Sequence, residues 1–573
     1  MIKQKNLIFL IIAVFLFQPF WVTAQDLPGQ EVVFNIEPSF DIQAMKETAA
    51  ILVKTSRTAY WYLDSRVLQT PEIDNALESL SREFEENIYP TLTKVFGSEW
   101  TPGIDKDTRI TILLHPMKDK KGGYFRSADE YPKIQIPISN EREMIYLNSQ
   151  HLVAGNAKSL LAHEFMHLIT FNQKDKKYNV SEDVWLNEGR AEYIPTLLGY
   201  DKDYDGSNLQ RRVKDFLNQP SNSLTEWRDY PEDYGIVNLF IQYLVDHYGI
   251  QILSDSLQMS KSGISSINAV LSKRGFKEDF SQAFINWAVT VTINDCKISE
   301  KYCYFNDNLK NIRIIPLLNY LPSVGPSTLS VVNTTKDWSG NWHRFIGGDG
   351  ILEIEFRSAP GSAFRVPYII EKKVGDFQID FLELDKQGTG KLLVDNFNSQ
   401  NMALTIIPIV QDKTSGFSSL EPPRSFSWSA STHKEKEETI PSLAPSLKPI
   451  SQMTREEIIA RIFEVKNLIA ILQAKLSELT GSRTSCQTIT QDLYFGMNDN
   501  FQVRCLQEFL KSQGKDIYPE GLITGNFYAA TRKAVIRFQE KYASEILIPA
   551  GEFRGTGYVG PLTRAKINNF LSK

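Results

Sequence analysis

The sequence predicts a multidomain protein in which an α+β domain is followed by a β-sandwich, an amphipathic helix and a small all-α domain. Three observations lead to this prediction. The chain has 573 residues, which is far beyond the size at which one hydrophobic core keeps growing. Helical and extended patterns are mixed over 31–150, helical spacing predominates from 151 to about 320, and apolar residues then alternate with polar residues over 328–411. A Ser- and Pro-rich tract over 412–453 separates these segments from the C-terminal part.

The N-terminal residues 1–24 predict an export signal that is removed from the mature protein. Lys3 and Lys5 give a positively charged start, and an apolar run covers 7–17. Val22 and Ala24 then supply the small residues that a signal peptidase accepts. The apolar run is short for a membrane-spanning helix, although a retained anchor is the alternative. We therefore expect an exported protein, either extracellular or associated with the cell envelope.

Composition fits a globular protein in an oxidising compartment. Hydrophobic residues make up 42% and charged residues 23%, and the net charge of −5 argues against a nucleic-acid binder, which needs a basic face. The four cysteines form two local pairs, Cys296 with Cys303 and Cys486 with Cys505. Both pairs can form disulfides outside the cytoplasm, and free buried thiols are the alternative.

Residues 25–320 predict the α+β domain. In its N-terminal α/β part, which extends to about residue 150, the stretch 76–95 has apolar residues at helical spacing. The stretches 109–115 and 143–148 have the apolar content of strands. From 151 to 320 the pattern is mostly helical, and it begins with an apolar helix that contains the pentapeptide HEFMH.

The pentapeptide HEFMH, residues 163–167, predicts a metal site. Residues four positions apart share one face of a helix, so His163 and His167 can direct two imidazole nitrogens at one ion. Glu164 then lies beside the ion, where it can take a proton from a bound water. Two histidines that share a helix face by chance are the alternative.

The stretch WLNEGRAEY, residues 185–193, predicts a third ligand. A catalytic zinc takes three protein ligands and leaves a fourth position for water. Glu188 lies far enough beyond His167 for the chain to turn and begin a second helix. Glu192, one helical turn later, could accept the second ring N–H of a liganding histidine. A solvated helix face is the alternative for both glutamates.

These two motifs together resemble the gluzincin metallopeptidases, which have a zincin-like fold, and most closely the secreted bacterial members with an Asn-Glu-Gly third-ligand motif. The similarity covers about residues 100–320. It implies one Zn²⁺ on His163, His167 and Glu188, with Glu164 as general base and acid. The spacing between the motifs is longer than in the aminopeptidase branch, and the G-x-M-E-N sequence of that branch has no match. The resemblance therefore implies an endopeptidase, with an aminopeptidase as the alternative.

Further site residues are expected after these motifs. Members of this family use a later Tyr or His to stabilise the oxyanion, and Tyr234 in DYGIVNLF is the match. Tyr230 and His247 are rivals, and a core role for Tyr234 is equally open. We also expect an edge strand at 143–148 to pair with an extended peptide substrate.

A polar loop carries part of a calcium-binding pattern. Asp201, Asp203 and Asp205 alternate along the loop, and Gly206 would supply the turn. The position that needs a bidentate glutamate holds Arg212 instead. The sequence therefore favours a surface loop over a Ca²⁺ site.

The middle of the chain predicts a sandwich, a linker and a helix. Residues 328–411 form alternating stretches separated by turn residues, which predicts a small antiparallel β-sandwich. The tract 412–453 has linker composition. Thr454 and Glu457 then form a capping box before a heptad pattern that extends over 454–480. This helix forms either a short coiled coil, which would make a dimer, or packs on a neighbouring domain.

The C-terminal residues 486–573 contain the stretches VRCLQEFL, GLITGNFYAATRKAVIRFQEKY and GTGYVGPLTRAKINNFL. These stretches resemble the peptidoglycan-binding domain of the three-helix type, which implies a small all-α domain that binds the wall polymer. Eleven Lys and Arg residues against eight Asp and Glu residues give this segment a positive charge, which suits an anionic polymer.

Taken together, the sequence predicts a secreted or envelope-associated zinc endopeptidase that cleaves protein or peptide substrates and is retained at the wall by its C-terminal domain. Peptidoglycan stem peptides are alternative substrates. The competing class is a catalytically inactive adhesin or wall scaffold that keeps a protease fold. The presence of every expected ligand and of the base argues against that class.

Overall fold

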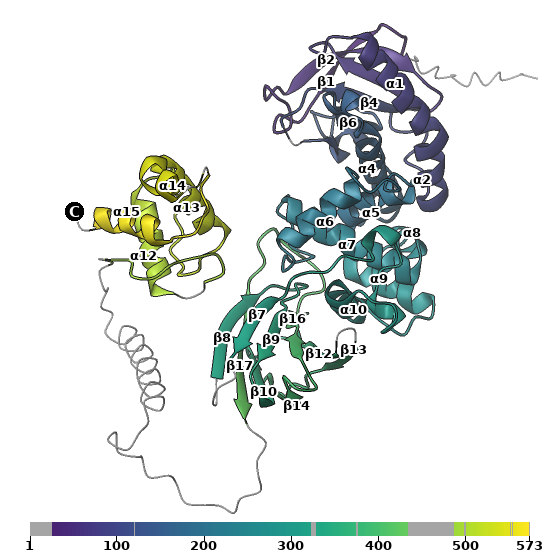
Figure 1. Cartoon of the computed structure of the whole chain (residues 1–573). Coiled ribbons are helices and arrows are strands. Elements are labelled where there is room, and N and C mark those ends of the chain that lie inside the picture. Colours follow the sequence, from purple (N-terminus) through teal and green to yellow (C-terminus); the bar gives the residue numbers. More distant parts are fainter. Residues whose placement is uncertain are drawn as a thin grey trace, which may run out of the picture. The chain divides into compact units, whose positions relative to one another are not determined.

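The computed structural model describes residues 26–119, 121–322, 328–373, 376–433, 486, 488–497, 500–550, 552 and 554–571. The described residues up to 433 form one compact unit, and those from 486 onward form another (Figure 1). The predicted export signal and the predicted coiled-coil helix lie outside the described residues. Within these ranges no helix is both long enough and apolar enough to cross a membrane.

The first domain is built on a six-stranded sheet with the order β1-β2-β3-β4-β6-β5. The strands β3, β4 and β6 run parallel, and the other neighbouring strands are antiparallel. The bounds are β1 (Glu31–Asn35), β2 (Glu47–Thr55), β3 (Ala59–Asp64), β4 (Ile110–His115), β5 (Gly123–Phe125) and β6 (Met144–Asn148). Alternate residues of the parallel strands enter two different apolar clusters, one on each face of the sheet.

The edge of this sheet differs from the prediction. The predicted edge strand at 143–148 is wrong, because β6 lies inside the sheet between β4 and β5. Every residue of β6 is buried, as expected for a parallel strand covered on both faces. The strand at the edge is β5, which has only three residues and therefore too short a pattern to be recognised in the sequence.

The helices of this domain pack on one face of the sheet and below it (Figure 1). Their bounds are α1 (Pro71–Glu83), η1 (Phe84–Ile88), α2 (Tyr89–Phe96), η2 (Ser127–Glu130), α3 (His151–Ala154), α4 (Ala157–Thr170), η3 (Phe171–Lys176), α5 (Val184–Leu197), α6 (Asn208–Asn218), α7 (Pro231–Tyr248), α8 (Gln251–Leu257), α9 (Gly263–Lys273), α10 (Phe280–Ile293), η4 (Glu300–Tyr302) and η5 (Asp307–Leu309). The helix α4 contacts β5, β6 and α5, so it joins the sheet to the lower helices.

A β-sandwich follows the helices. One sheet has the order β14-β10-β17-β8 and the other β13-β12-β15-β9-β7, with β11 and β16 as a separate pair. The bounds are β7 (Leu317–Leu321), β8 (Thr328–Thr335), β9 (His343–Gly347), β10 (Gly350–Ser358), β11 (Phe364–Arg365), β12 (Pro367–Lys373), β13 (Asp376–Phe381), β14 (Thr389–Phe397), β15 (Ala403–Ile406), β16 (Ile409–Val410) and β17 (Arg424–His433). Inward residues of both sheets form one apolar cluster, and β7 pairs with β9 in parallel rather than antiparallel.

The sandwich extends beyond its predicted end into the predicted linker 412–453. The strand β17 pairs with β10 on one side and β8 on the other, so it is a central strand. Its inward positions include Phe426, Trp428 and Ala430, which are buried and alternate with serines on the outer face. The serine content resembles a linker, but the alternation is that of a half-buried strand.

The sandwich also holds the loop that precedes α7. The backbone N–H of Leu224 donates to the carbonyl of Trp338 at 2.9 Å, and the Ser223 hydroxyl donates to the carbonyl of Asp337 at 2.7 Å. The indole of Trp338 packs on Phe280 of α10 with ring centroids 4.8 Å apart. The sandwich and the lower helices therefore share part of one core.

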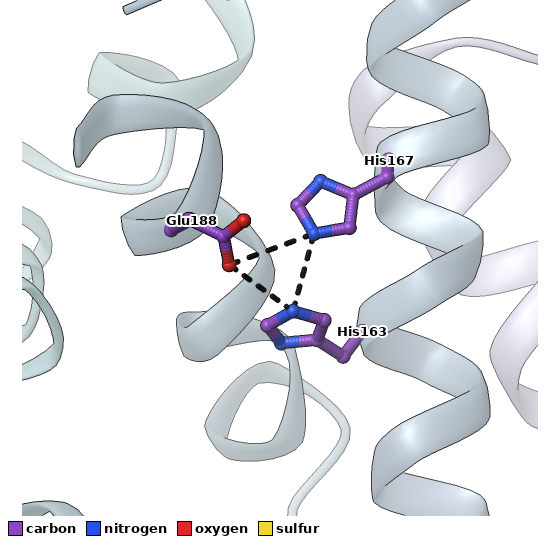
Figure 2. A group of neighbouring side chains, drawn as sticks. All are labelled: His163, His167 and Glu188. Carbon is purple, nitrogen blue, oxygen red and sulfur yellow. Dashed lines mark hydrogen bonds and ion pairs between the residues drawn. The ribbon is translucent and has the colours of Figure 1, made fainter. Parts of the chain in front are cut away.

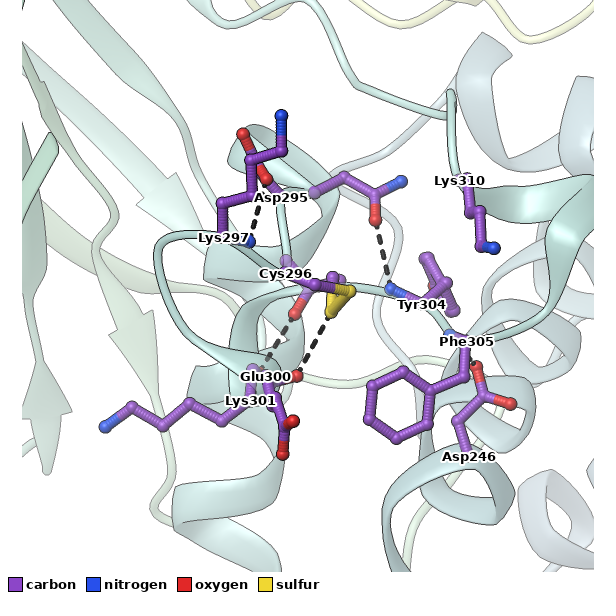
Figure 3. The surroundings of a disulfide bond; sticks show 12 residues. Asp246, Asp295, Cys296, Lys297, Glu300, Lys301, Tyr304, Phe305 and Lys310 are labelled. Carbon is purple, nitrogen blue, oxygen red and sulfur yellow. Dashed lines mark hydrogen bonds between the residues drawn. A yellow bond between two sulfur atoms is a disulfide. The ribbon is translucent and has the colours of Figure 1, made fainter. Parts of the chain in front are cut away.

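Both predicted disulfides are present, Cys296–Cys303 and Cys486–Cys505. Figure 3 shows the first bridge in a loop near α7, where Asp246 accepts from the backbone N–H of Phe305 at 2.7 Å. The bridge fixes the chain immediately after α10.

The C-terminal unit contains α12 (Phe501–Ser512), α13 (Ala529–Lys541), α14 (Ala543–Ala550) and α15 (Pro561–Leu571), so a short helix stands between two of the three expected ones. Two buried glutamines hold equivalent turns. The amide of Gln507 donates to the Asn526 carbonyl and accepts from the Gly525 N–H, and Gln539 binds Tyr558 and Gly557 in the same way. The unit is thus organised by an internal repeat that sequence analysis missed.

Candidate metal centre

Three of the predicted site residues converge on one point. The Nε2 atoms of His163 and His167 lie 3.1 Å apart, and the Glu188 Oε2 lies 3.4 Å from the first and 3.7 Å from the second (Figure 2). One ligand atom from each residue falls within 4.8 Å of the others, and no other such group of three occurs among the described residues.

The convergence follows from the packing of two helices. The two histidines lie one turn apart on α4, and α5, which carries Glu188, packs directly against α4. Next to this glutamate stands Gly189, where an added Cβ would lie 2.8 Å from Ile241 of α7. The absence of a side chain there lets α5 pack closely between α4 and α7.

The donor set fits a divalent cation. The Glu188 Oε2 is buried and has no hydrogen-bond partner in the described part of the chain, although two imidazoles face it. Two imidazoles and a carboxylate are typical ligands of a catalytic zinc. A cation placed between them would satisfy an otherwise unpartnered buried oxygen.

The Nδ1 atom of each imidazole, which does not face Glu188, contacts a residue of α5. The Glu192 Oε1 lies 3.4 Å from Nδ1 of His163, and the Asn187 Oδ1 lies 3.2 Å from Nδ1 of His167. Such contacts fix the ring orientation of a liganding histidine. Sequence analysis named Glu192 but gave no role to Asn187, although its place directly before Glu188 in the motif was a signal.

The carboxylate of Glu192 is itself paired. The Arg212 guanidinium binds it through two nitrogens, at 2.6 and 2.8 Å. Burial would raise the pKa of Glu192, but the charge and hydrogen bonds of Arg212 outweigh burial and lower it to about 2. The group that supports His163 is therefore a stable anion. Arg212 is the residue that stands where a calcium-binding loop needs a glutamate, and in the structure its partner is Glu192.

The predicted base, Glu164, lies under the edge strand. A Cβ added at Gly123 of β5 would stand 3.0 Å from Cγ and 3.2 Å from Oε1 of Glu164. The side chain is buried, and burial raises its pKa. The carboxyl group therefore occupies the space between the metal ligands and the unpaired edge of the sheet.

Of the three candidates for an oxyanion donor, only Tyr234 adjoins the centre. Burial and then the charge of Glu188 raise the pKa of Tyr234. Its hydroxyl donates to Asp229 Oδ1 at 2.6 Å. Tyr230 is 51% exposed, and the His247 ring contacts the carbonyl of Cys303 at 2.9 Å, away from the metal ligands.

The aspartates of the calcium-like pattern do not meet at one point. Asp201 accepts from the hydroxyl of Thr196 and from the backbone N–H of Leu209, and Asp205 accepts from Gln210. They form no three-residue metal group with Asp203 in the part of the chain that the structure describes. Residues 201–206 lie in the turns that connect α5 to α6.

A buried ion cluster anchors the start of α5. The Glu182 Oε2 lies 3.2 Å from the ammonium of Lys174 and 3.1 Å from the guanidinium of Arg190, and all three side chains are almost fully buried. Removing one partner of such a cluster leaves an uncompensated buried charge. The cluster ties the end of the α4 region to the helix that carries Glu188, and sequence analysis did not detect it.

Part of the chain is similar in sequence to a known protein. No family model matches the chain. The chain is 28% identical over 224 residues to the neutral metalloprotease ShpI of Staphylococcus hyicus, in an alignment that covers 35% of this chain and 48% of that protein. The chain thus matches about half the length of this relative.

Similarities to solved structures are weak. The pre-peptidase C-terminal domain of a Bacillus anthracis collagenase has a TM-score of 0.14 and 7% identity, covering 20% of this chain and 96% of that domain. The Aeromonas hydrophila lysozyme inhibitor PliG has a TM-score of 0.14 and 9% identity, covering 20% and 98%. Neither similarity supports an argument about this protein.

Two further buried acids lie outside the metal centre. Glu130 is 3% exposed and Glu143 is 2% exposed, and the Glu143 Oε1 accepts from the backbone N–H of Ile104 at 2.8 Å. Burial raises the pKa of Glu143 to about 7, and burial with the charge of Glu143 raises the pKa of Glu130. Burial and, at Glu130, repulsion from Glu143 therefore favour the protonated forms of these two carboxyl groups.

This pair predicts a loss of stability as pH rises. An unfolded glutamate has a pKa of about 4.3, so between this value and the raised pKa the folded state binds more protons than the unfolded state. The free energy of unfolding should fall by roughly 2 kcal/mol between about pH 5 and pH 8, relative to a Glu143→Gln variant. Urea unfolding at several pH values measures this difference. A Glu78→Gln variant, changed at an exposed glutamate, should follow the native curve, and parallel curves for native and Glu143→Gln proteins would contradict the prediction.

Proposed function

We propose that this chain is an exported, zinc-dependent endopeptidase. The observation that carries the proposal is the convergence of His163, His167 and Glu188 from two helices, with Glu164 beside them. The sequence similarity to a neutral metalloprotease supports the same class of reaction. The two disulfides support an extracellular or envelope location, because such bonds persist in oxidising compartments.

Each residue of the site has its own proposed role in peptide hydrolysis. Zinc bound by the three side chains would supply a Lewis acid for the scissile carbonyl and lower the pKa of a water. The Glu164 carboxylate takes a proton from the attacking water and passes it to the departing amine. Its buried position beside the edge strand places this transfer away from bulk water. Glu192 and Asn187 keep the two imidazoles oriented throughout.

The edge strand β5 supplies a place for the substrate backbone. One side of β5 pairs with β6, and it is the terminal strand of the sheet. An extended peptide can add to such an edge through main-chain hydrogen bonds. Because Gly123 lies over Glu164, a peptide at this edge would pass the general base. This arrangement favours cleavage within a chain, and peptidoglycan stem peptides are an alternative extended substrate.

Tyr234 is the proposed donor to the oxyanion. Its hydroxyl is held by Asp229, which in turn lies 2.9 Å from the ammonium of Lys121. The Arg212 guanidinium lies over the Tyr234 ring, 4.3 Å from its centroid. Burial, the charge of Glu188 and the hydrogen bond to Asp229 keep the phenol neutral, and the guanidinium over the ring restricts its motion. In the reaction the phenol would turn its single O–H from Asp229 to the charge that develops on the carbonyl oxygen.

The C-terminal unit is the proposed wall anchor. It is compact in its own right, and its resemblance to peptidoglycan-binding domains and its positive charge support this role. Dimerisation through residues 454–480 stays a prediction. An inactive adhesin or scaffold is the competing function, which the following variant separates from an enzyme.

A Glu164→Gln variant should keep the metal and lose the activity. The amide fills the same space but cannot accept a proton, so hydrolysis of an unfolded protein should fall at least about a thousandfold. Zinc content by elemental analysis and the release of new amines measure the two properties. A Glu78→Gln variant provides the same chemical change at an exposed position and should retain full activity.

The scaffold alternative predicts a different result. It would be supported if the native protein binds zinc but releases no peptides from any unfolded substrate. If zinc is absent from the native protein after loading and dialysis, the proposed metal centre is wrong.

A Tyr234→Phe variant should lower kcat about 100-fold with little change in KM, because the hydroxyl is used chiefly in the transition state. Steady-state kinetics on a quenched peptide provides the test. Tyr230→Phe removes a hydroxyl from the exposed neighbour and should leave both constants unchanged. Equal kinetics of native and Tyr234→Phe proteins would remove Tyr234 from the mechanism.

The anchoring role can be tested with the whole protein. Incubation with purified sacculi followed by sedimentation should bring down the intact chain but not a chain that ends at residue 485. The variant that lacks the unit should still cleave soluble peptides at the native rate. Equal sedimentation of both chains would contradict the anchor.

A further inference from the structure

A hollow of about 550 Å³ lies outside the catalytic residues described above. Its walls include the rings of Trp100, Tyr131 and Phe171 and the side chain of Ile104. We call it the aromatic hollow. Lys106, Glu130 and other polar residues complete its lining.

The aromatic hollow continues the catalytic face of α4. Phe171 directly follows α4 and stands four residues after His167 and eight after His163, so all three lie on one side of the helix. The ring of Phe171 is 6.0 Å from that of Phe125 at the end of β5 and 5.9 Å from that of Tyr131. The hollow therefore begins where both the metal-binding face and the edge strand end.

The distance along the helix from His167 to Phe171 relates the aromatic hollow to a position in the substrate. Four helical residues from His167 to Phe171 span about 6 Å, and a strand advances about 3.3 Å per residue. A peptide on β5 would thus reach the hollow about two residues from the one at the metal. Antiparallel pairing is the more stable arrangement, and it places this residue on the N-terminal side of the cleaved bond.

We propose that the aromatic hollow is a specificity subsite for a large aromatic side chain about two residues before the cleaved bond. The inference rests on the proposed function, because it takes the position of the bond from the metal centre. Tyr131 and Phe171 offer ring contacts that an aromatic side chain can use, and the ammonium of Lys176 lies over the ring of Trp100, 2.8 Å from its centroid. Lys106 and Lys176 in the lining disfavour lysine or arginine in the substrate.

Two acids, Glu130 and Asp175, also line the hollow, and burial raises the pKa of both. Glu130 would attract a basic side chain if it were ionised. Its carboxylate oxygens are inaccessible to solvent, and its pKa is raised by burial and by Glu143. Both effects disfavour the charged form of Glu130, which weakens its attraction for a basic side chain.

Binding to the zinc-loaded Glu164→Gln protein tests the subsite independently of catalysis. The probes are short fluorescent peptides of one scaffold with Phe, Ala or Lys at the chosen position, and anisotropy gives Kd. The Phe peptide should bind about tenfold more tightly than the Ala peptide, and the Lys peptide no better than Ala. When Tyr131→Ala or Trp100→Ala is introduced into the Glu164→Gln protein, the Phe and Ala peptides should bind with nearly equal Kd. The Kd of the Ala peptide itself should stay unchanged.

Phe276→Ala serves as the control, because Phe276 is another partly exposed aromatic residue and lies outside the hollow. The subsite is contradicted if the Phe and Ala peptides bind with equal Kd. It is also contradicted if the roughly tenfold preference for the Phe peptide remains in both the Tyr131→Ala and the Trp100→Ala variants. The native protein is assayed for cleavage with the same peptides. A binding preference without cleavage would contradict the proposed function and retain the subsite, whereas cleavage without a preference would contradict the subsite alone.

Discussion

The close packing of α5 on α4 is the constraint on which the rest of the site depends. It brings a carboxylate from one helix to two imidazoles of another, and it requires Gly189 at the point where α5 meets α7. The buried Glu182, which pairs with Lys174 and Arg190, fixes the chain just before α5 begins. Because such a cluster is costly to break, it limits the sliding of one helix along the other.

This packing concentrates negative charge in a small buried volume. Glu164, Glu188 and Glu192 all lie close to the two histidines, and their mutual repulsion must be offset. Arg212 neutralises Glu192, which leaves the other two beside the imidazoles. A divalent cation at the three ligand atoms would offset the charge of Glu188 and leave Glu164 free to exchange a proton. One ion at this point would therefore serve both the electrostatics of the site and the proposed reaction.

The parts of the site that were predictable from sequence depend on local periodicity. The spacing of His163 and His167 places them on one helix face whatever the tertiary structure is. The contact of Asn187 with His167 depends on how two helices pack, and no local pattern encodes it. The edge position of β5 is likewise a property of the whole sheet. In β17 the alternation of Phe426 and Trp428 with serines was visible, but composition was given more weight than periodicity.

The sandwich contributes to the site through the loop before α7. This loop is hydrogen-bonded to the sandwich at Ser223 and Leu224, and the Glu226 carboxylate accepts from the backbone N–H of Glu421 at 2.9 Å. The same loop ends at Asp229, which holds the hydroxyl of Tyr234. Displacement of the sandwich would therefore move the proposed oxyanion donor relative to the ligands on α4 and α5. Because these contacts are buried and the two parts share one core at Trp338, the sandwich is part of the framework of the site.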